Sequence, residues 1–235
     1  MRCIEISGGD SNVVESHAHI LAPLRIMSPQ EPSPEESLLD PSSVEPDPVA
    51  QFRRWYDEAV AAGVAQPDAM TLATATPDGV VSARTVLLRG LDERGFVFFT
   101  NFDSAKGGEL ARNPRAALVF HWREQQRQVR VVGGVARVSD ADATRYWESR
   151  PRGHRISAWA SPQSEVVERV ALEARVAEVE ARFAGSDPPL PPFWGGFVVH
   201  VEQLECWQGR TDRLHDRVRY RPSGAGGWIC ERLAP

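Results

Sequence analysis

A series of short apolar runs, each followed by turn-forming residues, constrains the fold of this chain more than any other feature. The runs cover residues 69–75, 80–88, 96–100, 116–122 and 128–138. Turn-forming residues separate them, with Pro-Asp-Gly at 77–79 and a second turn at 92–95. This spacing is typical of strands in an antiparallel meander or barrel. The sequence therefore predicts a β-rich α+β domain with helices outside a sheet.

Three helices are predicted around these strands. The first has Asp47 as its N-cap and Pro48 in its first turn, and it stops at Gly63. Its buried stripe is expected to consist of Phe52, Tyr56, Ala59 and Val60. The second helix is capped by Ser139 and runs through Trp147.

The third predicted helix opens at Pro162 or Ser164 and ends at Gly185. Apolar residues recur along it at helical spacing, which indicates core or interface packing. They are Val166, Val170, Val176, Val179 and Phe183. A strand over residues 197–207 and a hairpin that pairs 218–220 with 228–229 complete the domain, which contains no internal repeat.

Charge divides the 235 residues into two parts. Residues 1–46 are rich in Ser, Pro and Glu, without helical or strand periodicity, and are predicted to form a flexible acidic arm before a domain spanning 47–235. Residues 1–47 hold nine acidic residues and two arginines, a balance of −7, which leaves 25 basic and 23 acidic residues elsewhere, a balance of +2. Such a balance excludes a nucleic-acid interface but permits a local anion pocket.

Cysteine usage and hydropathy indicate a soluble cytoplasmic protein. Cys3, Cys206 and Cys230 form neither a CxxC pair nor an even disulfide framework. No apolar segment reaches the length of a membrane span, and no secretory leader is recognised. His17 and His19 lie in the polar arm without further ligands, so no metal site is expected.

A cationic segment at residues 207–217 predicts a binding site. If it is a strand, Arg213, His215 and Arg217 project from one face beside Trp207. Such a face suits an anionic, planar ligand. The alternative is a solvated strand face on which neighbouring aspartates neutralise the arginines.

A second candidate site lies at residues 99–106, where a strand runs into a turn. Lys106 is the only lysine in the chain, and we expect it to converge with Ser104 and backbone amides as a phosphate clamp. The segment lacks the glycine pattern of a P-loop or of a dinucleotide-binding fold.

Further polar clusters fall at the ends of other predicted strands and helices. Arg84 and Arg89 differ in parity, so they face opposite sides of a regular strand unless a bulge or the strand end redirects one. Other clusters lie at residues 127–130, 146–152 and 158–164.

Taken in order, these clusters resemble the pyridoxine (pyridoxamine) 5′-phosphate oxidase family. The resemblance runs from about residue 47 to residue 235, roughly four-fifths of the chain. Its most specific segments are residues 84–88, 99–106, 127–129, 149–151, 163–164, 194–196 and 207–217.

The resemblance implies an FMN-binding split β-barrel, antiparallel and Greek-key-like, that forms a homodimer with FMN at the interface. It implies an enzyme that oxidises pyridoxine 5′-phosphate or pyridoxamine 5′-phosphate with O2 to pyridoxal 5′-phosphate and H2O2. Such an enzyme serves vitamin B6 biosynthesis and salvage.

The resemblance also implies site residues. The cofactor contacts would be Arg84, Val86, Leu87, Arg89, Phe99, Thr100, Ser104, Lys106, Gln128, Gln163, Ser164, Trp207 and Arg217. The substrate contacts would be Arg89, Tyr146, Arg150, His154, Arg213 and His215. Arg213 and His215 would be catalytic, because they would orient the pyridine ring on the flavin.

The chain departs from the family pattern in four places. The family usually has Lys at the position of Arg89, a basic residue at that of Ala105, and Ser at that of His154. The N-terminal arm of this chain also lacks the Arg-Arg-Glu-Tyr type of segment that closes over the substrate in some relatives.

Two other functions fit the same residues. One is an FMN-dependent oxidase of secondary metabolism, of the phenazine type, that acts on an unphosphorylated aromatic substrate. The other is a protein that binds flavin or pyridoxal phosphate with little turnover. Arg213 and His215 together favour the vitamin B6 oxidase.

Overall fold

The computed structural model describes residues 38–235, which contain ten strands and five α-helices. The strands are β1 (Ala69–Ala75), β2 (Val81–Leu87), β3 (Gly90–Asp92), β4 (Gly95–Asn101), β5 (Arg115–Trp122), β6 (Arg127–Arg137), β7 (Trp194–Val199), β8 (Gln203–Gln208), β9 (Asp216–Pro222) and β10 (Trp228–Arg232). The helices are α1 (Pro48–Ala61), α2 (Ala105–Arg112), α3 (Asp140–Ser149), α4 (Arg152–Ala160) and α5 (Arg169–Arg182). The β-rich α+β prediction is confirmed.

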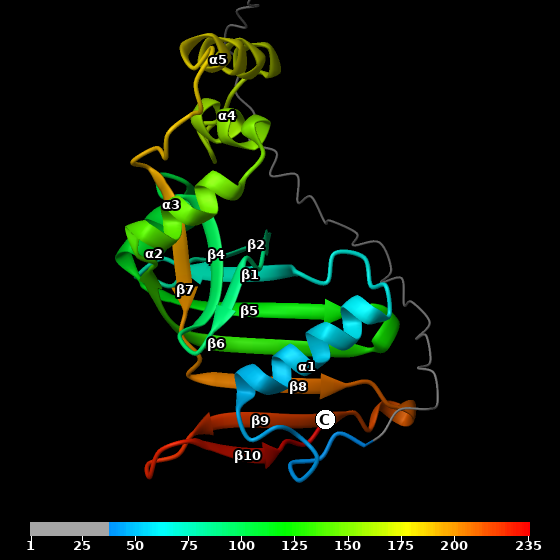
Figure 1. Cartoon of the computed structure of the whole chain (residues 1–235). Coiled ribbons are helices and arrows are strands. Elements are labelled where there is room, and N and C mark those ends of the chain that lie inside the picture. Colours follow the sequence, from blue (N-terminus) through cyan, green and yellow to red (C-terminus); the bar gives the residue numbers. More distant parts are fainter. Residues whose placement is uncertain (1–37) are drawn as a thin grey trace, which may run out of the picture. The chain divides into compact units, whose positions relative to one another are not determined.

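The strands form one antiparallel sheet that curls through β6 (Figure 1). Its main path is β10-β9-β8-β6-β5-β1-β2, while β7, β4 and β3 branch away from it. The first part of β6 pairs with β8 and its last residues pair with β7, so β6 belongs to both surfaces. Gly133 lies at this change of partner, where a Cβ atom would stand 1.6 Å from the carbonyl oxygen of His200. Only glycine allows this approach.

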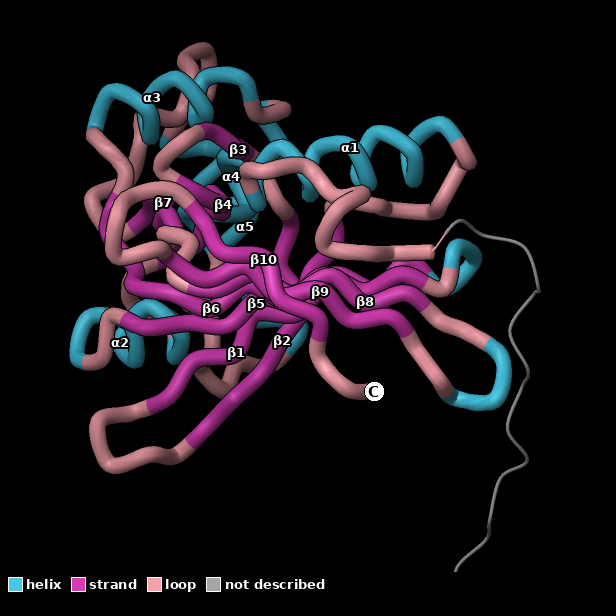
Figure 2. Tube along the Cα trace, turned by 90° about the horizontal axis from the view of Figure 1, so that it is seen from below, coloured by secondary structure: helices cyan, strands magenta, loops and turns pink. Residues whose placement is uncertain are grey.

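Helix α1 lies along one face of the sheet (Figure 2). Its start is as predicted, because the Asp47 side chain accepts a hydrogen bond from the Ala50 N–H at 2.8 Å. Phe52 is buried and packs against Phe96 and Phe120, with ring centroids 4.7 and 4.6 Å away. Contacts of this kind form the core between α1 and the sheet.

The predicted stripe of α1 was partly wrong. Phe52 and Ala59 are buried, but Val60 is 51% exposed and Tyr56 only half-buried. Trp55 takes the expected place of Val60, because positions 52, 55 and 59 face the sheet together. The buried apolar stripe of this helix is therefore limited to the positions that contact the sheet.

The third predicted helix was wrong in its start and in its packing. Helix α5 begins at Arg169, and none of its residues is buried within the protomer. Val170 is 77% exposed, whereas Phe183, just after the helix, is buried. The valine spacing therefore gives this helix no share in the protomer's core.

Three other features of the secondary structure also differ from the prediction. The strand expected over residues 197–207 is two strands, β7 and β8, because the chain crosses between the two surfaces of the sheet at 200–202. The turn expected at Lys106 is the first turn of α2. Helix α4 was not predicted, since its N-cap, Pro151, offers no side-chain cap.

Residues 38–46 lie against the sheet, although the arm was predicted to extend to residue 46. Leu39 is buried in the core, and its N–H donates to Asp216 at 3.2 Å. The hydroxyl of Tyr220 donates to the Glu45 carbonyl at 2.8 Å. The arm prediction for residues 1–37, which include Cys3, His17 and His19, lies outside the described residues. Within residues 38–235, no helix is long and apolar enough to cross a membrane.

Candidate functional site

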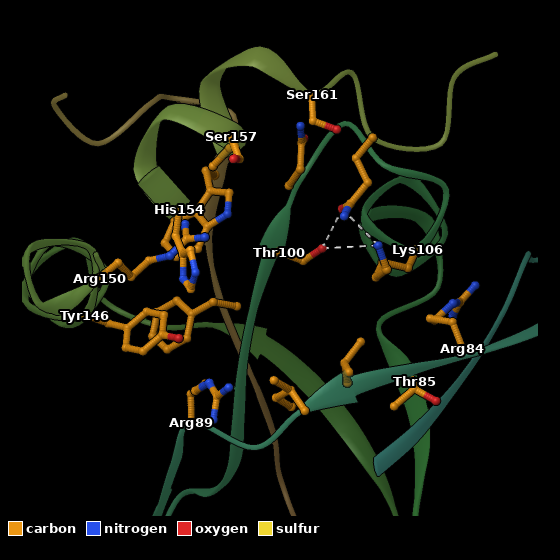
Figure 3. A pocket seen from close by; sticks show the side chains of 17 residues that line it. Arg84, Thr85, Arg89, Thr100, Lys106, Tyr146, Arg150, His154, Ser157 and Ser161 are labelled. Atoms are coloured by element: carbon orange, nitrogen blue, oxygen red, sulfur yellow. Dashed lines mark hydrogen bonds between the residues drawn. The ribbon is translucent and has the colours of Figure 1, made fainter. Parts of the chain in front are cut away.

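A cavity of about 680 Å³ opens beside the edge strand β2 (Figure 3). Strands β2 and β4 form one wall, and helices α2, α3 and α4, the start of β7 and the segments after β2, α3 and α4 contribute the rest. Eleven predicted site residues line it: Arg84, Val86, Leu87, Arg89, Phe99, Thr100, Lys106, Tyr146, Arg150, His154 and Gln163.

Lys106 is the centre of one polar group in this cavity. Ser104 caps α2 by accepting a hydrogen bond from the Gly107 N–H at 3.3 Å, which places Lys106 in the first turn. The Lys106 ammonium donates to Thr100 Oγ1 and Ser104 Oγ at 3.2 Å and to Gln163 Oε1 at 3.0 Å. All three acceptors are neutral, so the positive charge is not paired with a carboxylate there.

Burial makes this charge costly. Lys106 is only 8% exposed, and burial, followed by the nearby charge of Arg84, lowers the pKa of its ammonium. A bound anion would remove much of that cost. With the N-terminus of α2 directed at the same place, the group is suited to a phosphate.

Arg150 is the centre of a second polar group, which Figure 3 shows apart from Lys106. Its guanidinium stacks over the Trp194 ring, 4.5 Å from the centroid, and Nη1 is buried without a hydrogen-bond partner. Burial lowers the pKa of Arg150. Phe99 and Tyr146 stack beside it, with ring centroids 4.0 Å apart. A partly buried guanidinium with a donor that no described residue uses is a second place for an anion.

Arg84 and Arg89 both line the cavity in spite of their opposite parity. Strand β2 ends at Leu87, so Arg89 lies beyond the regular strand and is redirected. It pairs with Asp68 at 2.5 Å, whereas Arg84 pairs with Glu109 at 3.2 Å. Both guanidinium charges are therefore compensated, unlike those of Lys106 and Arg150.

The other predicted residues do not line the cavity. Ser104 Oγ accepts a hydrogen bond from the Lys106 ammonium, and Ser164 Oγ accepts one from the Ala105 N–H at 3.2 Å. The remainder lie on β6, β8, β9 and the segment before β9: Gln128, Trp207, Arg213, His215 and Arg217.

This second cluster has its own geometry. Gln128 is paired with Trp207 in the sheet, and Trp207 with Arg217. The rings of Trp207 and His215 lie 4.7 Å apart. Arg217 Nε donates to buried Glu205 at 2.8 Å. The cluster thus combines an aromatic face with cationic groups, as the sequence predicted.

The predicted strand through Arg213 and His215 was wrong. Thr211–Arg213 form a 3-10 turn, and β9 begins only at Asp216. Asp212 and Arg213 have φ values of 53° and 59°, which no strand accommodates. Arg213 is consequently exposed on a turn, and His215 accepts a hydrogen bond from the Arg210 N–H at 3.1 Å.

One protomer does not bring the cavity and the second cluster together. Strand β8 is separated from β2 by β6, β5 and β1. With neighbouring strands about 4.8 Å apart, four steps correspond to roughly 19 Å. A single small ligand therefore does not reach from one to the other within this chain.

Two family models match the chain. Residues 56–183 match a family model described as pyridoxamine 5′-phosphate oxidase. The chain belongs to the pyridoxamine 5′-phosphate oxidase family. Residues 194–235, which include Trp207–Arg217, match the pyridoxine 5′-phosphate oxidase C-terminal dimerisation region.

Curated members of this oxidase family are closely similar to the chain. A pyridoxine/pyridoxamine 5′-phosphate oxidase 1 of Ralstonia nicotianae is 58% identical over 198 residues, 84% of this chain and 93% of that protein. A pyridoxine/pyridoxamine 5′-phosphate oxidase of Rubrobacter xylanophilus is 55% identical over 192 residues, 81% and 88% of the two chains.

Solved structures confirm the split-barrel prediction for this oxidase-family chain. PhzG from Burkholderia lata, in complex with tetrahydrophenazine-1-carboxylic acid, is 33% identical with a TM-score of 0.81, covering 87% of this chain and all of that one. A pyridoxamine 5′-phosphate oxidase-related, FMN binding protein from Nostoc punctiforme is 20% identical with a TM-score of 0.64, covering 78% and 97%. The second likeness concerns the fold alone.

Six residues that line the cavity in this family member were not predicted: Thr85, Asn101, Ser157, Ala158, Ser161 and Trp194. Trp194 belongs to a segment that carried the family resemblance, so its motif was a usable signal. Ser157 and Ala158 lie on α4, the helix that was missed. Recognising that helix would have placed both of them about one turn after His154.

Proposed function

We propose that the chain is an FMN-dependent oxidase that converts pyridoxine 5′-phosphate or pyridoxamine 5′-phosphate to pyridoxal 5′-phosphate, with O2 as acceptor and H2O2 as product. One observation carries this proposal. A single cavity contains two separate cations, buried Lys106 and partly buried Arg150, for which no carboxylate partner is found among the described residues. Two such anchors suit a reaction in which cofactor and substrate each carry a phosphate.

The first anchor fits the phosphate of FMN. Lys106, Ser104 and the N-terminus of α2 converge on one point, and Thr100 and Gln163 hold the ammonium there. Ala105 supplies no cation to this group, so the uncompensated charge is that of Lys106, while Arg84 in the same cavity is paired with Glu109. Bound FMN would supply the two-electron acceptor chemistry, with O2 as final acceptor.

The second anchor fits the substrate phosphate. Arg150 would use its unpaired Nη1, and Tyr146, His154 and Arg89 lie around it. Arg89 and His154, where the family usually has Lys and Ser, keep donors at these positions. Held by its phosphate, the substrate would have its reacting carbon positioned against the flavin.

The homodimer would complete the site. We infer that a second copy supplies Gln128, Trp207, Arg213, His215 and Arg217, because the dimerisation region carries four of them and they are remote from the cavity in one protomer. Gln128, Trp207 and Arg217, which lie in strands, are on the face of the sheet opposite α1. In the middle of that face lie Ala73, Ala117 and Val119, which are small enough for a close approach.

The test of the proposed function is an assay of the purified protein. It should be yellow, release FMN rather than FAD on denaturation, and consume O2 with pyridoxine 5′-phosphate but not with unphosphorylated pyridoxine. FAD or no flavin after reconstitution would contradict the cofactor. A flavoprotein that consumes no O2 with pyridoxine 5′-phosphate or pyridoxamine 5′-phosphate would instead be a protein that binds flavin or pyridoxal phosphate with little turnover.

The phenazine-type oxidase is the second candidate, favoured by the likeness to PhzG. Its substrate would carry no phosphate, so Arg150 would bind another anionic group, such as the carboxylate of the tetrahydrophenazine-1-carboxylic acid found with PhzG. Equal O2 consumption with phosphorylated and unphosphorylated pyridoxine would favour this candidate.

Sharing of the site between protomers can be tested by complementation. Lys106→Ala and Arg213→Ala homodimers should both be nearly inactive at limiting FMN and substrate. A heterodimer purified with two different tags should regain about half of the wild-type activity per dimer, because one of its two sites is intact. Arg213 is exposed, so its removal should not disturb folding. An inactive heterodimer would show that both residues act within one protomer.

A further inference from the structure

A largely buried carboxylate, Glu109 on α2, contacts Arg84, which lines the cavity that we assign to the cofactor. Its side chain is 12% exposed. It accepts hydrogen bonds from Ser82 Oγ at 2.8 and 2.9 Å, from Arg84 Nη2 at 3.2 Å, and from Thr74 Oγ1. Burial disfavours its charge, but these hydrogen bonds outweigh burial and keep the pKa of Glu109 below its ordinary value.

The same groups fix the guanidinium of Arg84. Its Nη2 donates to Ser82 Oγ at 2.5 Å as well as to Glu109. Its Nη1 donates to Thr74 Oγ1 and to the Leu72 carbonyl at 3.4 Å. Each hydroxyl accepts from Arg84 and donates to Glu109, so the carboxylate orients both hydroxyls as well as the guanidinium.

The presence of the Glu109 carboxylate beside a proposed phosphate site is unexpected on electrostatic grounds. Arg84 lines the cavity and is close enough to Lys106 to lower the pKa of that lysine. Coulomb's law alone predicts that a negative charge beside the two cations weakens the binding of a phosphate. Within the described residues around this network, Glu109 compensates Arg84 while Lys106 has only neutral acceptors.

We propose that Glu109 is a positioning residue, which holds the Arg84 guanidinium at the cavity wall in the orientation that receives the cofactor phosphate. The inference rests on the proposed function, because it takes the phosphate to be that of FMN. The hydroxyls of Thr74 and Ser82 connect Glu109 to the two terminal nitrogens of the Arg84 guanidinium. The benefit is preorganisation: the arginine does not have to be ordered when the cofactor binds.

Glu109→Gln tests this role, because the amide has nearly the same shape but faces Arg84 with an N–H group or loses a hydroxyl partner. We expect FMN binding to weaken roughly three- to tenfold, the cost of ordering one long side chain. This sign is opposite to that expected from charge alone, since the substitution removes a negative charge beside an anion site.

The experiment is a double-mutant cycle on full-length protein freed of flavin. FMN dissociation constants are measured by fluorescence quenching for the wild type, Glu109→Gln, Arg84→Ala and the double variant. If Glu109 acts through Arg84, Glu109→Gln has no further effect once Arg84 is absent. Glu173→Gln is the matched control, because Glu173 is an exposed, ion-paired glutamate on α5. It should bind FMN like the wild type.

Ser82→Ala provides a second variant should Glu109→Gln fold poorly, as thermal unfolding of the flavin-free proteins would reveal. It removes one supporting hydroxyl and should weaken FMN binding in the same direction, again only when Arg84 is present. Tighter or unchanged FMN binding in Glu109→Gln would overturn the inference, as would additive effects in the cycle. A wild-type protein without affinity for FMN would overturn the proposed function itself, and this inference with it.

Discussion

Replacing Lys106 by Ala should weaken FMN binding by about one to two decades, which is the largest effect we expect from a single cofactor contact. The loss of a charge-assisted hydrogen bond corresponds to roughly 1.5–3 kcal/mol. Lys106 is buried and no carboxylate among the described residues shares its charge, so Arg84, which Glu109 already compensates, should replace its contact only in part. FMN titration of the flavin-free protein measures the effect.

Arg112→Ala is the control for Lys106→Ala. Arg112 ends the same helix, is exposed, and donates to the Gly108 carbonyl at 3.1 Å. Its removal should leave the FMN dissociation constant unchanged. If Lys106→Ala bound FMN as tightly as this control, Lys106 would not be the phosphate anchor.

The lowered pKa of Lys106 gives FMN binding a pH dependence. Burial and Arg84 favour the neutral amine, so the ammonium loses its proton at a lower pH than an ordinary lysine. FMN affinity should therefore fall with rising pH already below about 10.4, the ordinary pKa of lysine. Lys106→Arg should show a flatter profile, because a guanidinium stays charged throughout.

Replacing Arg150 by Ala should raise KM for pyridoxine 5′-phosphate by about ten- to a hundredfold. Its buried Nη1 is the donor left for the substrate phosphate. If Arg150 only anchors the phosphate, kcat holds; a fall in kcat as well would show that it also positions the reacting carbon. Steady-state O2 consumption measures both constants.

Arg145→Ala is the matched control for Arg150→Ala. Arg145 lies on α3 one turn before the end of that helix, and its side chain is 78% exposed. It should leave KM unchanged. A normal KM in Arg150→Ala would place the substrate phosphate elsewhere and favour the phenazine-type alternative.

Local sequence signals determined most strands and the start of the first helix. The run at 69–75 is β1 to the residue, because turn residues bound it on both sides. Asp47 and Pro48 specified the start of α1 through a cap and a fixed backbone angle. Ser104 and Lys106 share one group of hydrogen bonds, because two positions in the sequence leave them little room to separate.

Contacts between distant parts of the chain decided the rest. Whether Trp55 or Val60 of α1 is buried depends on how the helix lies on the sheet, and the guanidinium of Arg150, between α3 and α4, stacks on Trp194 of β7. The end of β2 brings Arg89 into the same cavity as Arg84, against their parity. The residues of 207–217 were recognisable in the sequence, but strand order alone places them four strands from β2, because pairing between strands is set by the whole sheet and not by neighbouring residues.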